Sequence, residues 1–313
     1  MIKKIIGSII FLGGLVLILF FSSKVLAPKE EVYNAGEYNR KVKELFYEAD
    51  NSIDVVFAGD SEVYSGYTPL HMYNEEGFTS YVLGTYGQRL CDTYALLKKM
   101  YEKQSPSLVV IETNCFFRFG GLADDTSDKF MNFVLKYIPA MKYHSRIKMK
   151  FLRPDSKNEA LMKGFIYRND TIAYKGGKWM HETDRIEEID RENIAYLDKI
   201  VEMAKSRGSE VIFVTTPSPD CHSYEKHNAI NKLADNLNVT YYDFNFDAGE
   251  IGIDWDKDTR DAGNHLNYKG ACKLSSYVAK LLSEKYSLPD HREDENFSKW
   301  INDYNVYLSL VEK

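Results

Sequence analysis

Residues 53–61 read Ile-Asp-Val-Val-Phe-Ala-Gly-Asp-Ser, a short apolar run that ends in a turn sequence. Continuous apolar runs of this length, bounded by turn residues, are typical of strands buried on both faces of a parallel sheet. Four later runs share the pattern, at residues 80–83, 108–111, 211–216 and 239–244. The sequence therefore predicts five buried strands.

The segments between these runs carry apolar residues at helical spacing. The clearest examples lie at residues 90–102, 190–207, 228–237 and 267–285. Strands that alternate with helices of these lengths predict an α/β fold, in which helices cover both faces of a doubly wound parallel sheet. We expect a three-layer αβα domain of the flavodoxin-like kind.

The 313 residues suit one large α/β domain with appendages. We divide the chain into an N-terminal anchor at 1–27, a charged stalk at 28–50, the α/β domain at 51–288 and an acidic, aromatic tail at 289–313. Within the domain, residues 118–185 lose the α/β rhythm, and we interpret them as an insertion or lid over the site.

Residues 5–23 form an uncharged run of 19 residues, preceded by Lys3 and Lys4 and followed by Lys24. About 20 apolar residues are enough for one membrane-spanning helix. The two lysines favour a cytoplasmic N-terminus. We therefore expect a single-pass protein of the cell membrane whose domain is extracytoplasmic.

A cleaved signal peptide is the alternative, because residues 25–27 (Val-Leu-Ala) resemble a small-residue cleavage site. The apolar run is longer than a usual signal core. Pro28 would make the scissile amide tertiary, which opposes cleavage. Both alternatives export the domain, and the sequence favours the uncleaved anchor.

The composition excludes several classes of function. The net charge of −6 argues against a nucleic-acid-binding protein. The four cysteines form no CxxC pair, which argues against a zinc site. We expect no cofactor and no catalytic metal. The cysteines are Cys91, Cys115, Cys221 and Cys272.

Two polar segments occupy the predicted carboxyl ends of strands, where ligands bind in open parallel sheets. Ser61 follows the first strand directly, as a nucleophile or as a plain helix N-cap. His265 lies in a loop, residues 261–267 (Asp-Ala-Gly-Asn-His-Leu-Asn), ahead of the last helix of the domain. A histidine there is suited to act as a general base.

Four segments together resemble the sequence blocks of the SGNH (GDSL-like) hydrolase superfamily. They are residues 57–61 (Phe-Ala-Gly-Asp-Ser), 82–87 (Val-Leu-Gly-Thr-Tyr-Gly), 110–114 (Val-Ile-Glu-Thr-Asn) and 261–267. The resemblance implies a serine esterase or O-acyltransferase. Ser61 would be the nucleophile, His265 the base and Asp261 the acid that orients it. The resemblance also assigns oxyanion binding to the Ser61 N–H, Gly87 and Asn114.

The match departs from the family pattern at several positions. Glu112 replaces a glycine, and Ala262 stands three residues before His265, where the family has its orienting aspartate. Asp261 reaches His265 only if Gly263 lets the loop bulge. Asp258 is the fallback.

The blocks and the N-terminal anchor are similar to those of exported proteins that modify cell-envelope polymers. These include the D-alanyl-lipoteichoic acid transfer proteins and the alginate O-acetylation proteins. The resemblance implies O-acyl transfer to, or ester hydrolysis on, a cell-envelope polysaccharide or teichoic-acid-like polymer. It also implies a polytopic membrane-bound O-acyltransferase as partner.

Two alternatives come from other classes of protein. One is a non-catalytic scaffold of the same fold that binds the polymer or the membrane partner, favoured by the altered third and last blocks. The other is a metal-dependent hydrolase, for which an acidic run supplies oxygen ligands. We interpret that acidic run as a solvated loop instead. The run consists of Asp243, Asp247, Asp254, Asp256 and Asp258.

The uncleaved anchor makes a direct prediction about the mature protein. Membranes washed with alkaline carbonate should retain the chain, because a spanning helix is not released with peripheral proteins. N-terminal sequencing should find residues that precede Pro28. A mature chain that begins at Pro28 would identify a signal peptide instead.

Overall fold

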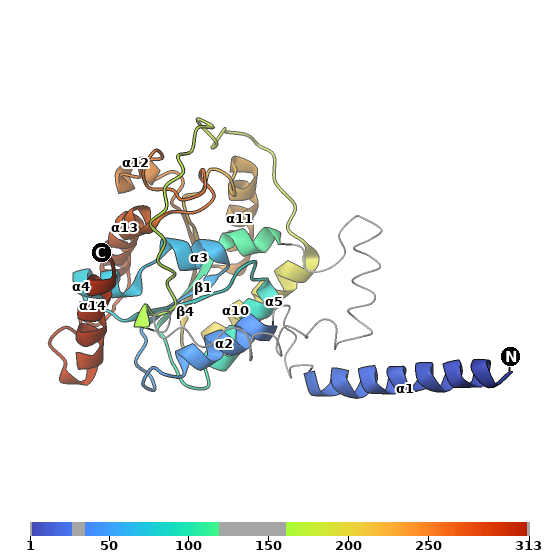
Figure 1. Ribbon diagram of the computed structural model, residues 1–313. Helices are drawn as coiled ribbons and strands as arrows, with labels where there is room; N and C mark the ends of the chain where they lie inside the picture. The colour runs from blue at the N-terminus through green and yellow to red at the C-terminus, as the bar shows by residue number, and fades with distance from the viewer. Residues whose placement is uncertain (1, 27–34, 119–160, 312–313) are drawn as a thin grey trace.

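The computed structural model describes residues 2–26, 35–118 and 161–311 (Figure 1). A five-stranded sheet in the order β2-β1-β3-β4-β5 forms the centre, and all its pairings are parallel. This is the doubly wound order whose switch point lies between β1 and β3. The predicted fold class is confirmed.

The five strands coincide with the five apolar runs. Each begins or ends within two residues of its run, and in the first three strands every residue is buried. The strands are β1 Val55–Gly59, β2 Ser80–Gly84, β3 Leu108–Glu112, β4 Glu210–Thr215 and β5 Thr240–Asp243.

Alternate residues of β1 enter two different cores, as the pleat of a strand requires. Val56 and Ala58 join the cluster under one layer of helices, whereas Val55 and Phe57 join the cluster under the other. Burial on both faces explains why the run shows no polar alternation in the sequence.

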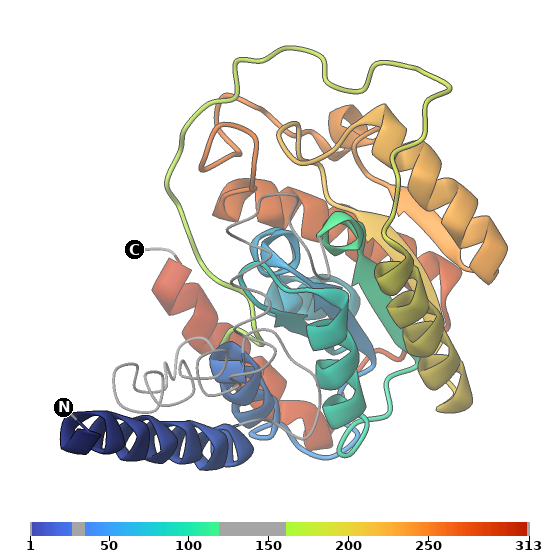
Figure 2. The ribbon, with the colours of Figure 1, turned by 90° about the vertical axis from the view of Figure 1, so that its right-hand side faces the viewer.

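Helices cover both faces of the sheet (Figure 2). One face carries α5 Leu90–Met100, α10 Arg191–Ser206 and α11 Tyr224–Leu237, and the other carries α3 Ser61–Gly66 and α13 Tyr268–Lys285. The four helices predicted between the runs are confirmed. However, α11 begins four residues earlier than expected, because the Ser223 side chain accepts from the Lys226 N–H and caps it.

The N-terminal helix α1, Ile2–Leu26, contains a stretch, Lys4–Ser22, with a mean hydropathy of 2.6. Within the described residues it alone is long and apolar enough to cross a membrane, and a signal sequence would meet the same criterion. The proposed cleavage point and the first part of the stalk, 27–34, lie outside the described residues. The later stalk forms α2 Ala35–Leu45, which packs against α5.

The described part of the predicted insertion runs over the carboxyl edge of the sheet as a strap, residues 161–190, with little regular structure (Figure 1). Its backbone bonds to the loop ahead of α13: the Ala262 N–H donates to the Ile172 carbonyl at 3.0 Å, and the Tyr268 N–H to that of Arg168 at 2.7 Å. The rest of the predicted lid, 119–160, lies outside the described residues.

A third apolar cluster joins α4 Pro69–Glu76 to the C-terminal helix α14 Ser298–Val311. Trp300 and Tyr307 of the tail are buried in it. The remaining short elements are η1 Thr113–Phe117, α12 Ala248–Ile251 and η2 Glu295–Phe297.

Beside this cluster lies Lys163, a fully buried cation. Its ammonium group donates to both carboxylate oxygens of Glu48, at 2.9 and 3.0 Å, and also to Asp303 of α14. It lies 4.5 Å from the centre of the Trp300 ring. This Lys163 cluster connects the segment after α2, the start of the strap and the C-terminal helix.

Candidate active site

Ser61 is the first residue of α3 and follows β1 after one residue. The intervening Asp60 caps the helix, because its carboxylate accepts from the Glu62 N–H at 3.1 Å. Ser61 is 3% exposed. The turn from strand to helix thus places Ser61 at the carboxyl edge of the sheet, as predicted.

The loop that carries His265 closes on itself ahead of α13. Thr259 and Leu266 form an antiparallel bridge at its base, and Ala262 and Gly263 have φ angles of +61° and +96°. A Cβ at position 263 would lie 2.8 Å from the Tyr174 ring, so only glycine fits there. The two left-handed residues produce the bulge on which the role of Asp261 depends.

Asp261 binds His265 through both carboxylate oxygens. One accepts from the His265 backbone N–H at 2.6 Å, and the other lies 2.6 Å from ring Nδ1. Burial opposes ionisation of Asp261, but these hydrogen bonds outweigh it and lower the pKa of the carboxyl. An ionised partner at Nδ1 holds the ring hydrogen there and leaves Nε2 with its lone pair.

Asp258 does not contact His265. Its carboxylate accepts from the Lys273 ammonium at 2.6 Å and from the Asp254 N–H at 2.7 Å. Of the two acids that the sequence left open, Asp261 is therefore the one on the imidazole.

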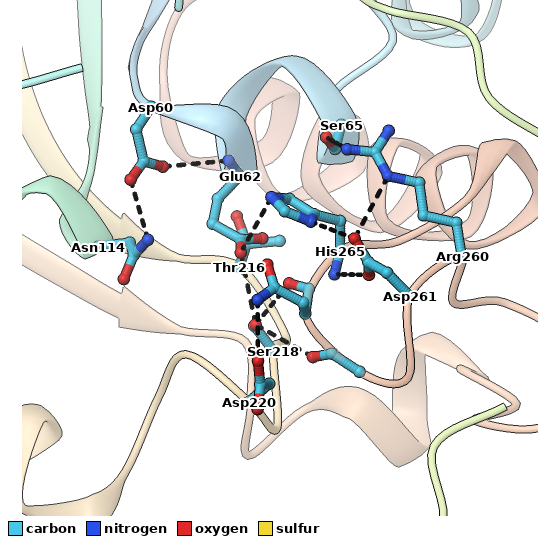
Figure 3. A network of polar contacts seen from close by, with 12 residues as sticks. Asp60, Glu62, Ser65, Asn114, Thr216, Ser218, Asp220, Arg260, Asp261 and His265 are labelled. Carbon is cyan, nitrogen blue, oxygen red and sulfur yellow. Dashed lines mark hydrogen bonds and ion pairs between the residues drawn. The ribbon is translucent and has the colours of Figure 1, made fainter. Parts of the chain in front are cut away.

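The free nitrogen of His265 points toward α3 (Figure 3). Nε2 is buried, makes no hydrogen bond within the part of the chain that the structure describes, and lies 3.9 Å from Oε1 of Glu62. Glu62 is the chain neighbour of Ser61. The structure therefore brings the predicted base to the helix that begins with the predicted nucleophile, although the Ser61 hydroxyl is not bonded to Nε2 in this conformation.

A second contact fixes the histidine loop against α3. The Arg260 guanidinium donates to Oγ of Ser65 at 2.9 Å, and its Nε lies 3.7 Å from the Asp261 carboxylate. Arg260 is thus a cation that holds both the loop and the acid that orients the imidazole.

Asn114 lies near Ser61, but its amide has another partner. It donates to Asp60 at 2.9 Å, and the same carboxylate oxygen accepts from Nε of Arg118. Asp60 is completely buried. The side chain to which the resemblance assigns oxyanion binding is therefore engaged with the capping acid of α3.

Gly87 lies in the turn after β2, with φ of +60°. Because Gly84 pairs in register with Gly59, this turn begins at the edge of the sheet where Ser61 lies. A Cβ at position 87 would meet no heavy atom within 4 Å. The glycine is required by the backbone conformation and not by crowding.

Two more buried acids flank the start of α3. Burial first, and then the neighbouring carboxylates, hold the pKa of Glu62 and that of Glu112 well above the usual glutamate range. Glu112 accepts from the backbone N–H groups of Asn114 and Thr216. The surroundings therefore favour the neutral form of both side chains.

Sequence reasoning missed Glu62 and three further contributors to this network: Arg118, Arg260 and Ser218. Ser218, beyond the end of β4, is bonded to the carbonyls of Gly263 and Asn264 and to Glu62. None of the three belongs to a recognisable block. The position of Glu62 directly after Ser61 was the only signal for that residue.

The acidic run of the C-terminal half does not gather into a site. Asp243 accepts from His222 at 2.9 Å and from His227 at 2.8 Å, while Asp254 accepts from Lys257. Among the described residues, no three His, Cys, Asp or Glu side chains are placed to hold a metal ion.

Comparison with known proteins gives matches in structure only. No protein-family model and no curated protein sequence matches the chain. A GDSL-like lipase from Bacteroides thetaiotaomicron aligns at 12% identity and a TM-score of 0.41, over 80% of this chain and 99% of the lipase. A lipase/acylhydrolase from Enterococcus faecalis aligns at 11% and 0.39, over 76% and 98%.

A psychrotrophic esterase from Pseudoalteromonas, solved with monoethylphosphonate as inhibitor, aligns at 10% identity and a TM-score of 0.39, over 74% of this chain and 97% of the esterase. At this level of similarity, the function of the chain has to be argued from its own side chains.

The geometry predicts the effect of neutralising Asp261. Asp261→Asn should slow any reaction that uses His265 as base by up to about 10⁴-fold, because the ring loses its orienting carboxylate. The rate of covalent labelling of Ser61 by an organophosphonate measures this. Asp258→Asn is the matched control and should label at close to the wild-type rate. The opposite ranking of the two variants would return the role to Asp258.

Proposed function

We propose that this chain is a serine-dependent acyl-transfer enzyme, an O-acyltransferase or esterase that works through an acyl-serine at Ser61. One observation carries the proposal. The unprotonated nitrogen of an imidazole held by a carboxylate points at the first turn of the helix that Ser61 begins, and it has no hydrogen-bond partner among the described residues. A base in this position needs a proton donor. Ser61, whose hydroxyl can supply the proton, directly precedes Glu62, the residue 3.9 Å from Nε2.

The reaction would proceed in two balanced steps. Ser61 Oγ attacks the ester carbonyl while its proton passes to Nε2 of His265, and collapse of the tetrahedral species returns that proton to the leaving alkoxide. Water or an acceptor hydroxyl then attacks the acyl-serine as His265 takes its proton, and the proton returns to Ser61 Oγ as the acyl group departs.

The developing oxyanion needs donors at the carboxyl edge of the sheet. We assign this role to the backbone N–H groups of Ser61 and Gly87. Asn114 would contribute after its amide leaves Asp60, which keeps Arg118 as partner. The loss of one hydrogen bond to Asp60 is the cost of that rotation.

We further propose that the acceptor is a hydroxyl of a cell-envelope glycopolymer. Support comes from a pocket of about 450 Å³ that combines aromatic surface with polar side chains at its rim. Apolar walls with a few polar groups are typical of ligand pockets, and aromatic faces can lie against the C–H face of a sugar. The lining residues are Lys178, Trp179, Met180, Glu182, Tyr224, Asn245 and Phe246.

The pocket is connected to the catalytic groups through two hydrogen bonds. Its Asn245 side chain accepts from the Ser218 N–H at 2.9 Å, and the Ser218 hydroxyl contacts Glu62. An acceptor bound there would approach the site from the β5 side of the sheet.

The apolar stretch Lys4–Ser22 supports the proposal that the domain acts at the outer face of a membrane. An acyl group that is activated in the cytoplasm would have to cross the bilayer to reach this domain. We therefore propose that a polytopic membrane-bound O-acyltransferase supplies the acyl groups.

A non-catalytic scaffold is the second candidate, and one observation favours it. The Ser61 hydroxyl is not bonded to His265, and the Asn114 amide is engaged with Asp60. In that case the edge of the sheet would bind polymer without forming a covalent intermediate.

An acyl-serine mechanism predicts covalent labelling of a single serine. A fluorophosphonate should label the full chain in detergent micelles, and peptide mass spectrometry should place the label on Ser61. Ser61→Ala should abolish labelling, whereas Ser283→Ala should retain it, because the Ser283 hydroxyl donates only to the Lys280 carbonyl of its own helix, α13. An unlabelled wild-type chain that still binds polymer would establish the scaffold.

The acceptor pocket predicts a separate effect on substrate binding. Phe246→Ala should raise the KM for a glycan acceptor by about 5- to 10-fold, since an aromatic contact contributes about 1 kcal/mol. Phosphonate labelling should not change, because the pocket does not hold the reacting serine. Ile301→Ala, an equally apolar and partly exposed position on α14, is the control.

A further inference from the structure

Glu62 is a buried acid among other acids. It is 1% exposed and faces Asp60 from its own turn, Glu112 from β3, and Asp261 with His265 from the loop ahead of α13. The Cys221 thiol, beyond β4, also lies against it. The nearby cations are engaged elsewhere: Arg118 with Asp60, and Arg260 with Ser65 and Asp261.

The hydrogen-bond partners of Ser218 indicate where the proton of Glu62 lies (Figure 3). Three oxygens surround Ser218 Oγ: the Asn264 carbonyl at 2.7 Å, the Gly263 carbonyl at 3.2 Å and Oε1 of Glu62 at 3.4 Å. A hydroxyl has one hydrogen, and backbone carbonyls only accept. The shortest contact takes that hydrogen to Asn264, so a bond between Ser218 and Glu62 requires the hydrogen to come from Glu62.

The electrostatics of the site agree with this assignment. An ionised Glu62 would place an unpaired charge in a buried position beside two other carboxyls, which is costly. Burial, Glu112 and Asp60 raise the pKa of Glu62, and together they outweigh the hydrogen bond with the Cys221 thiol, which lowers it. Protonation of Glu62 removes this charge. It also supplies an O–H group that can donate to the Ser218 oxygen, whose own hydrogen goes to Asn264.

The charge on Glu62 would decide how readily the His265 imidazolium releases its proton. An ionised carboxylate 3.9 Å from Nε2, added to Asp261 at Nδ1, would stabilise the imidazolium and hold the proton that a base has to release. A carboxylate there would also oppose the oxyanion that forms next to Ser61. A neutral Glu62 avoids both effects.

We propose that Glu62 is a protonated positioning residue: its carboxyl O–H donates to Ser218 Oγ, fixes the His265 loop through Asn264, and leaves Asp261 as the one carboxylate charge on the imidazole. The inference rests on the proposed function of Ser61 and His265. The proton of Glu62 itself, however, can be measured without any activity.

The first test is the pH profile of phosphonate labelling of the full chain in micelles, whose acid limb reports protonation of the group that activates Ser61. Glu62→Gln supplies an amide donor and no charge, as a protonated glutamate does. We expect it to shift the midpoint of the limb by less than about 0.3 pH unit. A fall of about one unit or more would show that Glu62 carries a charge, and would overturn the proposal.

A control variant shows that the profile responds to charge. Arg260→Gln removes a cation next to Asp261 and should raise the midpoint, because the imidazolium is then less opposed. A wild-type chain that does not label at all would count against the proposed acyl-serine function, and would leave the protonation of Glu62 to the second test.

The second test is infrared difference spectroscopy of wild type minus Glu62→Gln at neutral pH. We expect the C=O band of a protonated carboxyl in the wild type. Ser218→Ala should move that band to higher frequency, because the O–H loses its acceptor. A carboxylate band in its place would refute the assignment, whatever the enzyme does.

Discussion

The site depends on the pairing of β1 with a parallel neighbour on each side. β1 is buried on both faces and is bonded to β2 and β3 along its length. A shift of one residue would exchange every side chain between the two cores, so the register is strongly fixed. That register brings the ends of β1 and β2 together and sets where Asp60 and Ser61 leave the sheet.

The carboxyl edge of this sheet carries several acids, at the place where the proposed reaction would develop negative charge. The structure handles each acid differently. Asp60 is ion-paired with Arg118, Asp261 is bonded to His265, and Glu112 accepts two backbone N–H groups under conditions that favour its neutral form. The pKa of Asp261 is lowered and that of Glu112 is raised, because the two carboxyls differ both in burial and in hydrogen-bond partners.

Burial explains how much the sequence could predict. Strands covered on both faces appear as unbroken apolar runs, and the less buried β5 was found from a similar run. The position of Ser61 followed from the end of the first run, and that of His265 from the polar loop ahead of the last helix of the domain. The bulge at Gly263 was the condition for Asp261 to reach the imidazole, and its positive φ meets that condition.

The remaining contacts had no local signal. The bonds of Ser218 to Glu62 and of Arg260 to Ser65 join residues more than 150 positions apart. Only the folded chain brings them together. The same holds for Asn114, whose proximity to Ser61 could be predicted but whose amide partner could not. The Lys163 cluster joins both ends of the domain in the same way: without α14, Lys163 would lose Asp303 and its indole neighbour while Glu48 stayed buried. The two ends of the domain therefore belong to one cooperative unit, and a protease cut in the exposed segment before α14 would loosen the segment that follows α2 as well.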